Sequence, residues 1–375
     1  TATTEIYTLS LHHALPISFE SLKQRLLPVV APGGPLMWIV PLVVTAIAGL
    51  LRMVNLAHPH LLIFDETYYV KDAFAMLQSG YEREWADDSD EQFIAGNPQL
   101  ENESSFVVHP PLGKWMIGVG MLLFGDFNGF GWRFSTALIG TLSVLLVTLC
   151  ARLLFGSHLL AGIAGLLMAI DGHSIVMSRT ALLDIFLMFF VLAAFYSLLK
   201  DRIHGRTALA RKLSVPEGNR PDDFLLMHGP MLWWRPWRLI AAIMLGGAVG
   251  IKWSALSFVA VFCLMAVLWD FGARRTAGIH KWQSAAFIRD GVYSFFTMMP
   301  LVLLTYLSTW TGWLVTQGGR YRQWAEENPG EGISWLPAPL RSLWHYHQAG
   351  YEFHTGLNSE HGWQSSPWTW PFAGR

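Results

Sequence analysis

Residues 35–54, PLMWIVPLVVTAIAGLLRMV, decide the fold class of this chain, because they form a long apolar run with a single charge near its end. A helix needs about 20 residues to cross the hydrocarbon core of a bilayer, and this run has that length. A short connection later the chain reads Phe64-Asp65-Glu66-Thr67, which places two adjacent carboxylates just beyond the run. The pattern predicts a membrane anchor followed at once by an acidic pair.

The composition of the whole chain also indicates a membrane protein. Hydrophobic residues make up 52% and charged residues only 14%, whereas soluble domains carry about 25% charged residues. The mean hydropathy is +0.34. A net charge of −1 provides no field that would attract nucleic acid. We therefore predict an all-α polytopic membrane protein whose partners include the lipid bilayer and exclude nucleic acid.

Apolar runs along the chain predict seven membrane-spanning helices. The expected spans are Pro35–Val54, Phe134–Leu154, His158–Ile170 extended through Met177, Ala181–Leu199, Leu239–Ile251, Trp253–Trp269 and Gly291–Trp310. An eighth run, Leu112–Gly125, is short for a span and is expected to lie on the membrane surface.

The charges of the loops orient these spans. Lys and Arg gather before the first span, in Lys200–Arg238 and in Phe271–Asp290, and basic loops are typically cytoplasmic. This rule predicts a cytoplasmic tail at 1–35, a transmembrane catalytic domain at 36–310 with a large extracytoplasmic loop at 55–133 carrying interfacial helices, and an extracytoplasmic segment rich in Trp and His at 311–375. Residues 1–18 are expected to be a disordered tail or foreign sequence, and the chain is expected to be truncated after its last residue.

The predicted topology gathers ionisable residues at one membrane face. They are Asp65, Glu66, His109, Lys114, Arg133, Arg179, Asp184 and Lys252. Charges at membrane depth are costly unless they are paired or functional. Several simpler explanations stay open: Arg133 and Lys252 fit snorkelling side chains, Arg179 and Asp184 fit one ion pair, the acidic pair fits a helix N-terminus, and His109 with its two prolines fits a rigid turn.

Group transfer from a lipid phosphate would use such a set of residues. A lipid anchor holds its phosphate at the interface, where Lys252, Arg179 and Arg133 are expected to lie. Cations stabilise the negative charge that develops on a departing phosphate, and a carboxylate can take the proton of an incoming alcohol. We therefore expect chemistry at a membrane surface on a lipid-borne substrate.

The ordered set of motifs resembles the protein O-mannosyltransferases, glycosyltransferases of the GT-C architecture. The motifs are Asp65-Glu66, HPPLGK at 109–114, Arg133 after Gly131-Trp132, Arg179 with Asp184, GIKW at 250–253, FHTGL at 353–357 and WTWP at 368–371. The resemblance runs from about Leu36 to Pro371. The short first loop and the lack of β-trefoil repeats after Trp310 are similar to the actinobacterial branch.

This resemblance implies a reaction and assigns roles. Asp65 would be the catalytic base that deprotonates an acceptor Ser or Thr, and Glu66 would shape the site and orient the acceptor. Mannose would pass from polyprenyl-phosphate-mannose, a substrate rather than a cofactor, to secreted or membrane proteins. The displacement would be single and inverting, at the outer face of the cell membrane, without a bound metal. The expected supporting residues are His109, Lys114, Asp184, His354 and His361.

Other readings remain open at this stage. Aminoarabinose transferases of lipid A share an early Asp, a Pro-Pro turn and a later Arg and Asp, and a mannolipid acceptor is a further variant. A polyprenyl-lipid transporter would show two similar halves with discontinuous helices, and the sequence has no internal repeat.

His345 and His347 are two residues apart, so on a helix they point in different directions, which argues against a metal site in the C-terminal segment. Leu340–Phe353 is expected to be an amphipathic surface helix.

Overall fold

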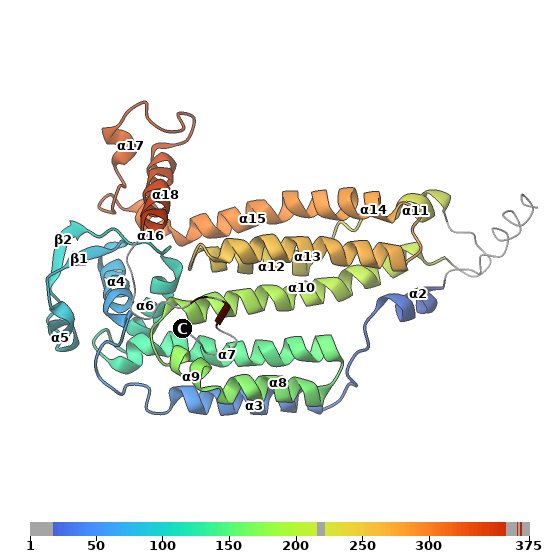
Figure 1. The fold of residues 1–375 in the computed structure, drawn as a ribbon, viewed down its shortest axis with the longest axis horizontal. Coiled ribbons are helices and arrows are strands. Elements are labelled where there is room, and N and C mark those ends of the chain that lie inside the picture. The colour runs from blue at the N-terminus through green and yellow to red at the C-terminus, as the bar shows by residue number, and fades with distance from the viewer. Residues whose placement is uncertain (1–17, 216–221, 358–365, 367, 370–375) are drawn as a thin grey trace, which may run out of the picture.

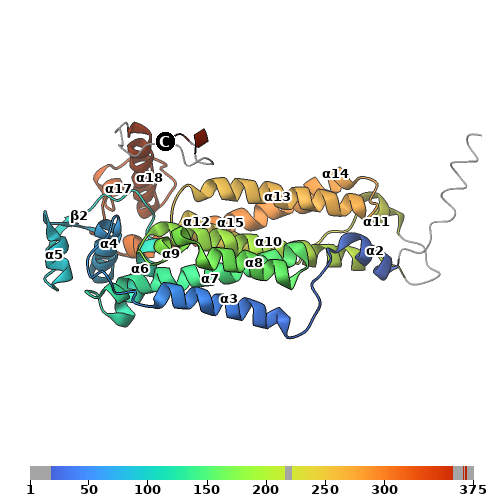
Figure 2. The same ribbon diagram turned by 60° about the horizontal axis from the view of Figure 1, so that its bottom comes forward.

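The core of the molecule is a bundle of long apolar helices that run side by side (Figures 1 and 2). The computed structural model describes residues 18–215, 222–357, 366, 368 and 369. Within them, five helices are long and apolar enough to cross a membrane: α3 (Leu36–Met53), α7 (Gly129–Phe155), α10 (Leu183–Leu213), α13 (Ala255–Thr276) and the continuous run Trp282–Thr309. This run joins α14 (Trp282–Ala285), a π-helical stretch (Ala286–Val292) and α15 (Tyr293–Thr309). The chain is a multi-pass membrane protein, as its composition predicted.

Two of the expected spans are less regular than the sequence suggested. Helices α8 (His158–Ile170) and α9 (Gly172–Ser178) reach span length only as a pair, and the pair is bent by 63°. Asp171 sits at the bend, where its carboxylate accepts the amide of Ser174 at 2.6 Å and starts α9. Helix α12 (Pro236–Val249) has only 14 residues. Length and composition therefore support up to six spans among the described residues, and the count of seven stays a prediction.

Helix α10 does not end at Leu199, as the apolar run predicted, but continues to Leu213. Its extension is held by buried charges: Asp201 accepts two hydrogen bonds from Arg235, at 2.8 and 2.6 Å, and one from Arg238 at 2.9 Å. These arginines were expected to lie in a basic cytoplasmic loop. They are buried instead, because carboxylates on neighbouring helices neutralise them.

The long loop after α3 gathers its elements at one end of the bundle, here called the site end (Figure 1). Its elements are α4 (Glu66–Ser79), β1 (Arg83–Trp85), α5 (Ser89–Ile94), β2 (Leu100–Ser104) and α6 (Leu112–Phe124). Helices α2 (Phe19–Leu26) and α11 (Asp223–His228) lie at the opposite end. Helix α6, at 13 residues, is too short to span a membrane and packs on α4 and α7. Its expected position on the membrane surface stays a prediction.

A small antiparallel ribbon continues from α4. Gly80 ends the helix with φ 84°, a left-handed conformation that glycine adopts at little cost. Strands β1 and β2 then pair with Arg83 opposite Ser104 and Trp85 opposite Leu100, with an irregularity between the two pairs. This ribbon forms one wall beside α4.

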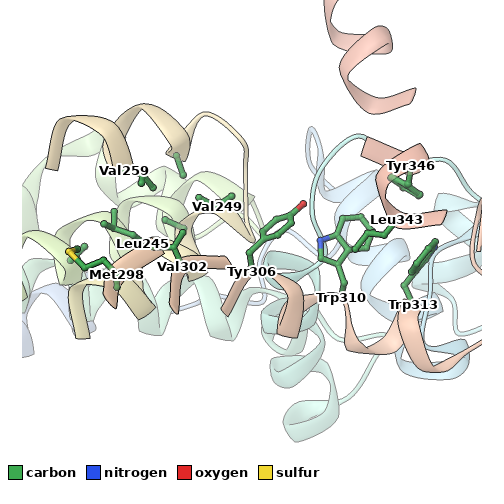
Figure 3. Close-up of a cluster of buried hydrophobic side chains, with 14 residues drawn as sticks. Leu245, Val249, Val259, Met298, Val302, Tyr306, Trp310, Trp313, Leu343 and Tyr346 are labelled. Carbon is green, nitrogen blue, oxygen red and sulfur yellow. The ribbon is translucent and has the colours of Figure 1, made fainter. Parts of the chain in front are cut away.

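An apolar core joins the bundle to the C-terminal helices. Figure 3 shows Tyr306 and Trp310 at the end of α15, with Leu343 and Tyr346 of α18 (Ala338–Gly356) beyond them. Helices α16 (Thr311–Val315) and α17 (Trp324–Glu327) connect α15 to α18. The Tyr346 hydroxyl donates to the carbonyl of Val107 at 2.7 Å and accepts its amide at 3.2 Å. The expected helix around Leu340–Phe353 is confirmed, and it is tied to the loop at the site end.

Candidate functional site

Asp65 lies directly before α4, yet its side chain makes no capping hydrogen bond. The turn is made by its backbone carbonyl, which accepts the amides of Tyr68 and Tyr69 at 3.0 Å each. Its carboxylate accepts a hydrogen bond from the Tyr69 hydroxyl at 3.4 Å and borders a cavity of about 730 Å³. The helix-end explanation accounts for the position of Asp65 but leaves its carboxylate facing the cavity.

Glu66, its neighbour, is fully buried and has no access to that cavity. Its carboxylate accepts four hydrogen bonds: from Arg133 Nε at 2.8 Å, from Arg133 Nη2 at 2.7 Å, from the amide of Ile63 at 2.9 Å and from the amide of Ala181 at 2.8 Å. The two carboxylates therefore separate, one facing the cavity and one facing the protein. Glu66 fixes the first turn of α4, and with it the position of Asp65.

Arg133 completes this buried network from α7. Besides Glu66 it donates to the carbonyls of Leu56 at 3.4 Å, Pro59 at 2.9 Å and Leu61 at 2.8 Å. Its side chain is 1% exposed, so the snorkelling explanation is wrong for this residue. The geometry also favours a positioning role for Arg133 over the expected contact with a donor phosphate, because its donors are occupied by protein groups.

Arg179 caps the end of α3, and Arg52 of α3 caps the end of α8. Arg179 Nη1 donates to the carbonyls of Leu51, Arg52 and Val54 at 2.7–3.2 Å, at the end of α3. Arg52, buried within α3, donates in return to the carbonyls of Met168 and Ala169 near the end of α8, at 3.3 and 3.1 Å. Last-turn carbonyls lack partners within their own helix, and a guanidinium satisfies them well.

Asp184 pairs with Lys252, so the alternative explanation of Arg179 and Asp184 as one ion pair is wrong. Lys252 Nζ lies 2.9 Å from both Asp184 oxygens. The lysine side chain is 19% exposed and the aspartate side chain 47% exposed, so both members of the pair are accessible at the surface of the site end. The amide of Leu112 donates to the carbonyl of Gly250 at 3.1 Å, which joins the HPPLGK turn to the GIKW turn. Lys252 is held by a partner rather than snorkelling.

Lys114 belongs to a buried cluster in the cavity wall. Its ammonium donates to Glu82 and lies 3.7 Å from Asp72 Oδ2. Burial raises the pKa of Asp72 to about 7, the charge of Lys114 opposes this, and the charge of Glu82 adds to it. Two acids therefore share one cation, so the cluster as a whole is acidic.

His109 lies between α4 and the C-terminal helix. Its ring centroid is 6.2 Å from that of Tyr69 and 6.1 Å from that of His354 on α18. Burial and the nearby charges of Lys252 and Lys114 lower the pKa of His109 to about 4, so the ring is neutral at physiological pH. The expected meeting of His354 with the site is therefore present, while His361 lies outside the described residues.

Three side chains in this site escaped the sequence analysis: Tyr69, Asp72 and Glu82. Tyr69 could have been found, because it follows Asp65 by four residues and such pairs share a helix face. Asp72 and Glu82 gave no comparable signal, since their meeting with Lys114 depends on tertiary packing.

No three His, Cys, Asp or Glu side chains come together to hold a metal ion anywhere in the described ranges. The expectation that the chemistry needs no metal stays a prediction.

Comparisons with known proteins identify the family of this chain. The profile of the family described as dolichyl-phosphate-mannose-protein mannosyltransferase matches residues 42–289. A polyprenol-phosphate-mannose–protein mannosyltransferase of Mycolicibacterium smegmatis strain MKD8 is 36% identical over 93% of this chain and 67% of the relative. A protein of the same name from Mycobacterium tuberculosis strain H37Rv is 35% identical over 94% of this chain and 67% of the relative.

A solved structure shares the fold. The structure of the S. cerevisiae protein O-mannosyltransferase Pmt1-Pmt2 complex bound to the sugar donor aligns with a TM-score of 0.52 at 20% identity, covering 80% of this chain and 36% of that chain. This likeness supports the predicted GT-C architecture. From the family profile and the mycobacterial relatives, the chain belongs to the dolichyl-phosphate-mannose-protein mannosyltransferase family.

Proposed function

We propose that this chain transfers mannose from polyprenyl-phosphate-mannose to the hydroxyl of a Ser or Thr in an acceptor polypeptide. One observation carries the proposal: the carboxylate of Asp65 faces a cavity of about 730 Å³ while the adjacent Glu66 is locked into the protein by Arg133. A cavity of this size is typical of ligand sites. The mycobacterial relatives, which carry the name of this reaction, support the donor and acceptor classes.

The reaction is a single displacement at the anomeric carbon of the donor. The acceptor oxygen attacks this carbon from the face opposite the phosphate, while Asp65 takes the hydroxyl proton. A new oxygen–carbon bond forms, and the bond from the anomeric carbon to the phosphate oxygen breaks with its electron pair staying on that oxygen. The products are an inverted mannoside, polyprenyl phosphate and a protonated Asp65. A positioned general base contributes about 10²–10⁴-fold to such a rate.

Among the three cations that the sequence predicted to bind the donor phosphate, Lys252 is the best placed to stabilise the departing phosphate. It is partly exposed, and it forms an ion pair with the half-exposed Asp184. Arg133 and Arg179 donate to a buried carboxylate and to backbone carbonyls, so their charges hold the scaffold. The donor-phosphate set predicted from the sequence therefore narrows to Lys252, with the two arginines as positioning residues.

The site end is proposed to face the outside of the cell membrane. The opposite end carries α2 and α11 with the exposed basic residues Arg211, Lys212, Arg275 and Lys281. Basic segments flanking membrane helices are typically retained in the cytoplasm. An extracytoplasmic site end would place Asp65 where secreted polypeptides emerge.

Transfer of radiolabelled mannose in membranes that contain the protein tests the proposal. We expect label from polyprenyl-phosphate-mannose to enter a Thr-containing acceptor peptide and not the same peptide with Ala in place of Thr. A chelator should leave the rate unchanged. Label that enters a mannolipid instead of the peptide would contradict the proposed acceptor, and loss of transfer with a chelator would contradict metal-free chemistry.

A further inference from the structure

Tyr69 contacts the proposed base, Asp65, and the proposed reaction gives it no role. It lies one helical turn after Asp65, on the same face of α4, and its hydroxyl donates to Asp65 Oδ2 at 3.4 Å. The side chain borders the cavity together with Asp65 and His109. The other carboxylate oxygen, Asp65 Oδ1, has no hydrogen-bond partner within the described part of the chain.

Charged and titratable groups from three elements surround this phenol. The carboxylates that face it are Asp65 and Asp72 of its own helix and Asp184 of α10, and His109 lies against its ring. The charges of Lys252, Lys114 and His354 in turn act on His109. Burial, and then the negative charges of Asp65 and Asp184, raise the pKa of Tyr69. The phenol therefore keeps its proton and acts as a neutral hydrogen-bond donor.

We propose that Tyr69 is a positioning residue that holds Asp65 Oδ2 and so assigns the proton transfer to Asp65 Oδ1. The inference rests on the proposed function, in which Asp65 is the base. The acceptor hydroxyl gives its proton to Oδ1, and Tyr69 keeps its own proton throughout. A contact of 3.4 Å is longer than the usual distance between hydroxyl and carboxylate oxygens, and catalytic hydrogen bonds often tighten when substrate binds.

The hydrogen bond acts on the chemical step rather than on substrate binding. Without the hydroxyl, Asp65 loses the contact that holds Oδ2, so proton transfer slows while KM stays near the wild-type value. A residue that serves only to pack α4 would not separate kcat from KM in this way.

The test is Tyr69→Phe, which keeps the ring against His109 and removes only the hydroxyl. We expect kcat to fall about tenfold, the order of magnitude of a lost hydrogen bond to a charged group. KM for the acceptor should stay near the wild-type value, because the interaction is lost in the chemical step. Tyr68→Phe is the matched control: Tyr68 borders the same cavity and is 65% exposed, and no hydrogen bond joins it to Asp65 among the described residues. Its kcat and KM should both stay at the wild-type values.

A double mutant separates this inference from the proposed function. If Tyr69 acts through Asp65, then adding Tyr69→Phe to Asp65→Asn should cost no further activity, since the two losses are coupled. Independent, multiplying losses, or a raised KM with an unchanged kcat in Tyr69→Phe, would overturn the role of Tyr69. Full activity in Asp65→Asn alone would overturn the proposed base instead. Equal amounts of each variant in the membrane, with equal unfolding midpoints, confirm that folding is intact.

Discussion

Glu66 and Arg133 form a buried, bidentate ion pair. Arg133 Nε lies 2.8 Å from Glu66 Oε1 and Arg133 Nη2 lies 2.7 Å from Glu66 Oε2, and the side chains of Glu66 and Arg133 are 0% and 1% exposed. Because of this pair, the adjacent acids Asp65 and Glu66 have different roles. Glu66 anchors the start of α4, and Asp65, one residue earlier, is presented to the cavity. The acidic pair is therefore one carboxylate for structure and one for chemistry.

Breaking the buried pair should destabilise the protein more than breaking an exposed one. Glu66→Gln leaves the charge of Arg133 buried without a counter-charge, which typically costs about 3–5 kcal/mol. Glu20→Gln is the control, since Glu20 pairs with Lys23 on the surface at 67% and 46% exposure, and such pairs contribute about 0–1 kcal/mol. Unfolding midpoints of the purified protein in detergent report both changes. Equal midpoints for the two variants would contradict the anchoring role.

Lys252→Ala should slow transfer strongly, because it removes the partly exposed cation that is proposed to stabilise the departing phosphate. Removal of one charge-stabilising donor typically costs about 10²–10³-fold in turnover. The control is Arg275→Ala, an exposed residue in the last turn of α13 at the opposite end. Arg274 would be a poor control, because it is buried against Asp290. Equally small effects of Lys252→Ala and Arg275→Ala on the rate would exclude Lys252 from phosphate stabilisation.

The sequence predicted the site better than it predicted the partners within it. Apolar runs and loop charge placed Asp65, His109 and Lys252 at one end of the molecule, because membrane helices restrict where the loops between them can lie. They could not show that Asp184 pairs with Lys252 rather than with Arg179. That choice depends on how the turn after α12 packs against the start of α10, which is tertiary information.

The sequence also predicted the ends of helices poorly, again because tertiary contacts determine them. Hydropathy placed the end of α10 at Leu199, where charged residues begin, whereas the helix continues to Leu213. Buried ion pairs make charged residues compatible with a packed helix, and a hydropathy scale that treats each residue alone gives no signal of pairing. The bend between α8 and α9 falls at Asp171-Gly172-His173-Ser174, the polar stretch across which the predicted span was extended through Met177.

Labelling of single cysteines tests the orientation of the bundle. Glu103→Cys places a thiol at an exposed position of β2 at the site end, and Ser214→Cys places one directly after α10 at the opposite end. An impermeant thiol reagent on intact cells should modify the first directly and the second only after permeabilisation. Modification of Ser214→Cys in intact cells would contradict an extracytoplasmic site end.

His109 should make stability depend on pH with a defined sign. Its pKa is lowered from 6.5 to about 4 by burial first and then by nearby cations. Between these values the unfolded chain binds a proton that the folded protein excludes, so stability falls as pH decreases from about 6.5 to about 4. His109→Gln removes this contribution, and its unfolding midpoint should fall less than that of the wild type over the same interval. Identical decreases would contradict a buried, neutral His109.

Asp65→Asn tests the central claim most directly, because asparagine keeps the size of the side chain but cannot take the proton of the acceptor. Mannose transfer to a Thr-containing peptide should be measured under saturating donor, beside Asp223→Asn, which makes the same change at an exposed position of α11 at the opposite end. We expect a rate about 10²–10⁴-fold lower in Asp65→Asn, with folding and membrane insertion intact, and a wild-type rate in Asp223→Asn. A rate in Asp65→Asn within a few-fold of the wild type would contradict the assignment of Asp65 as the base.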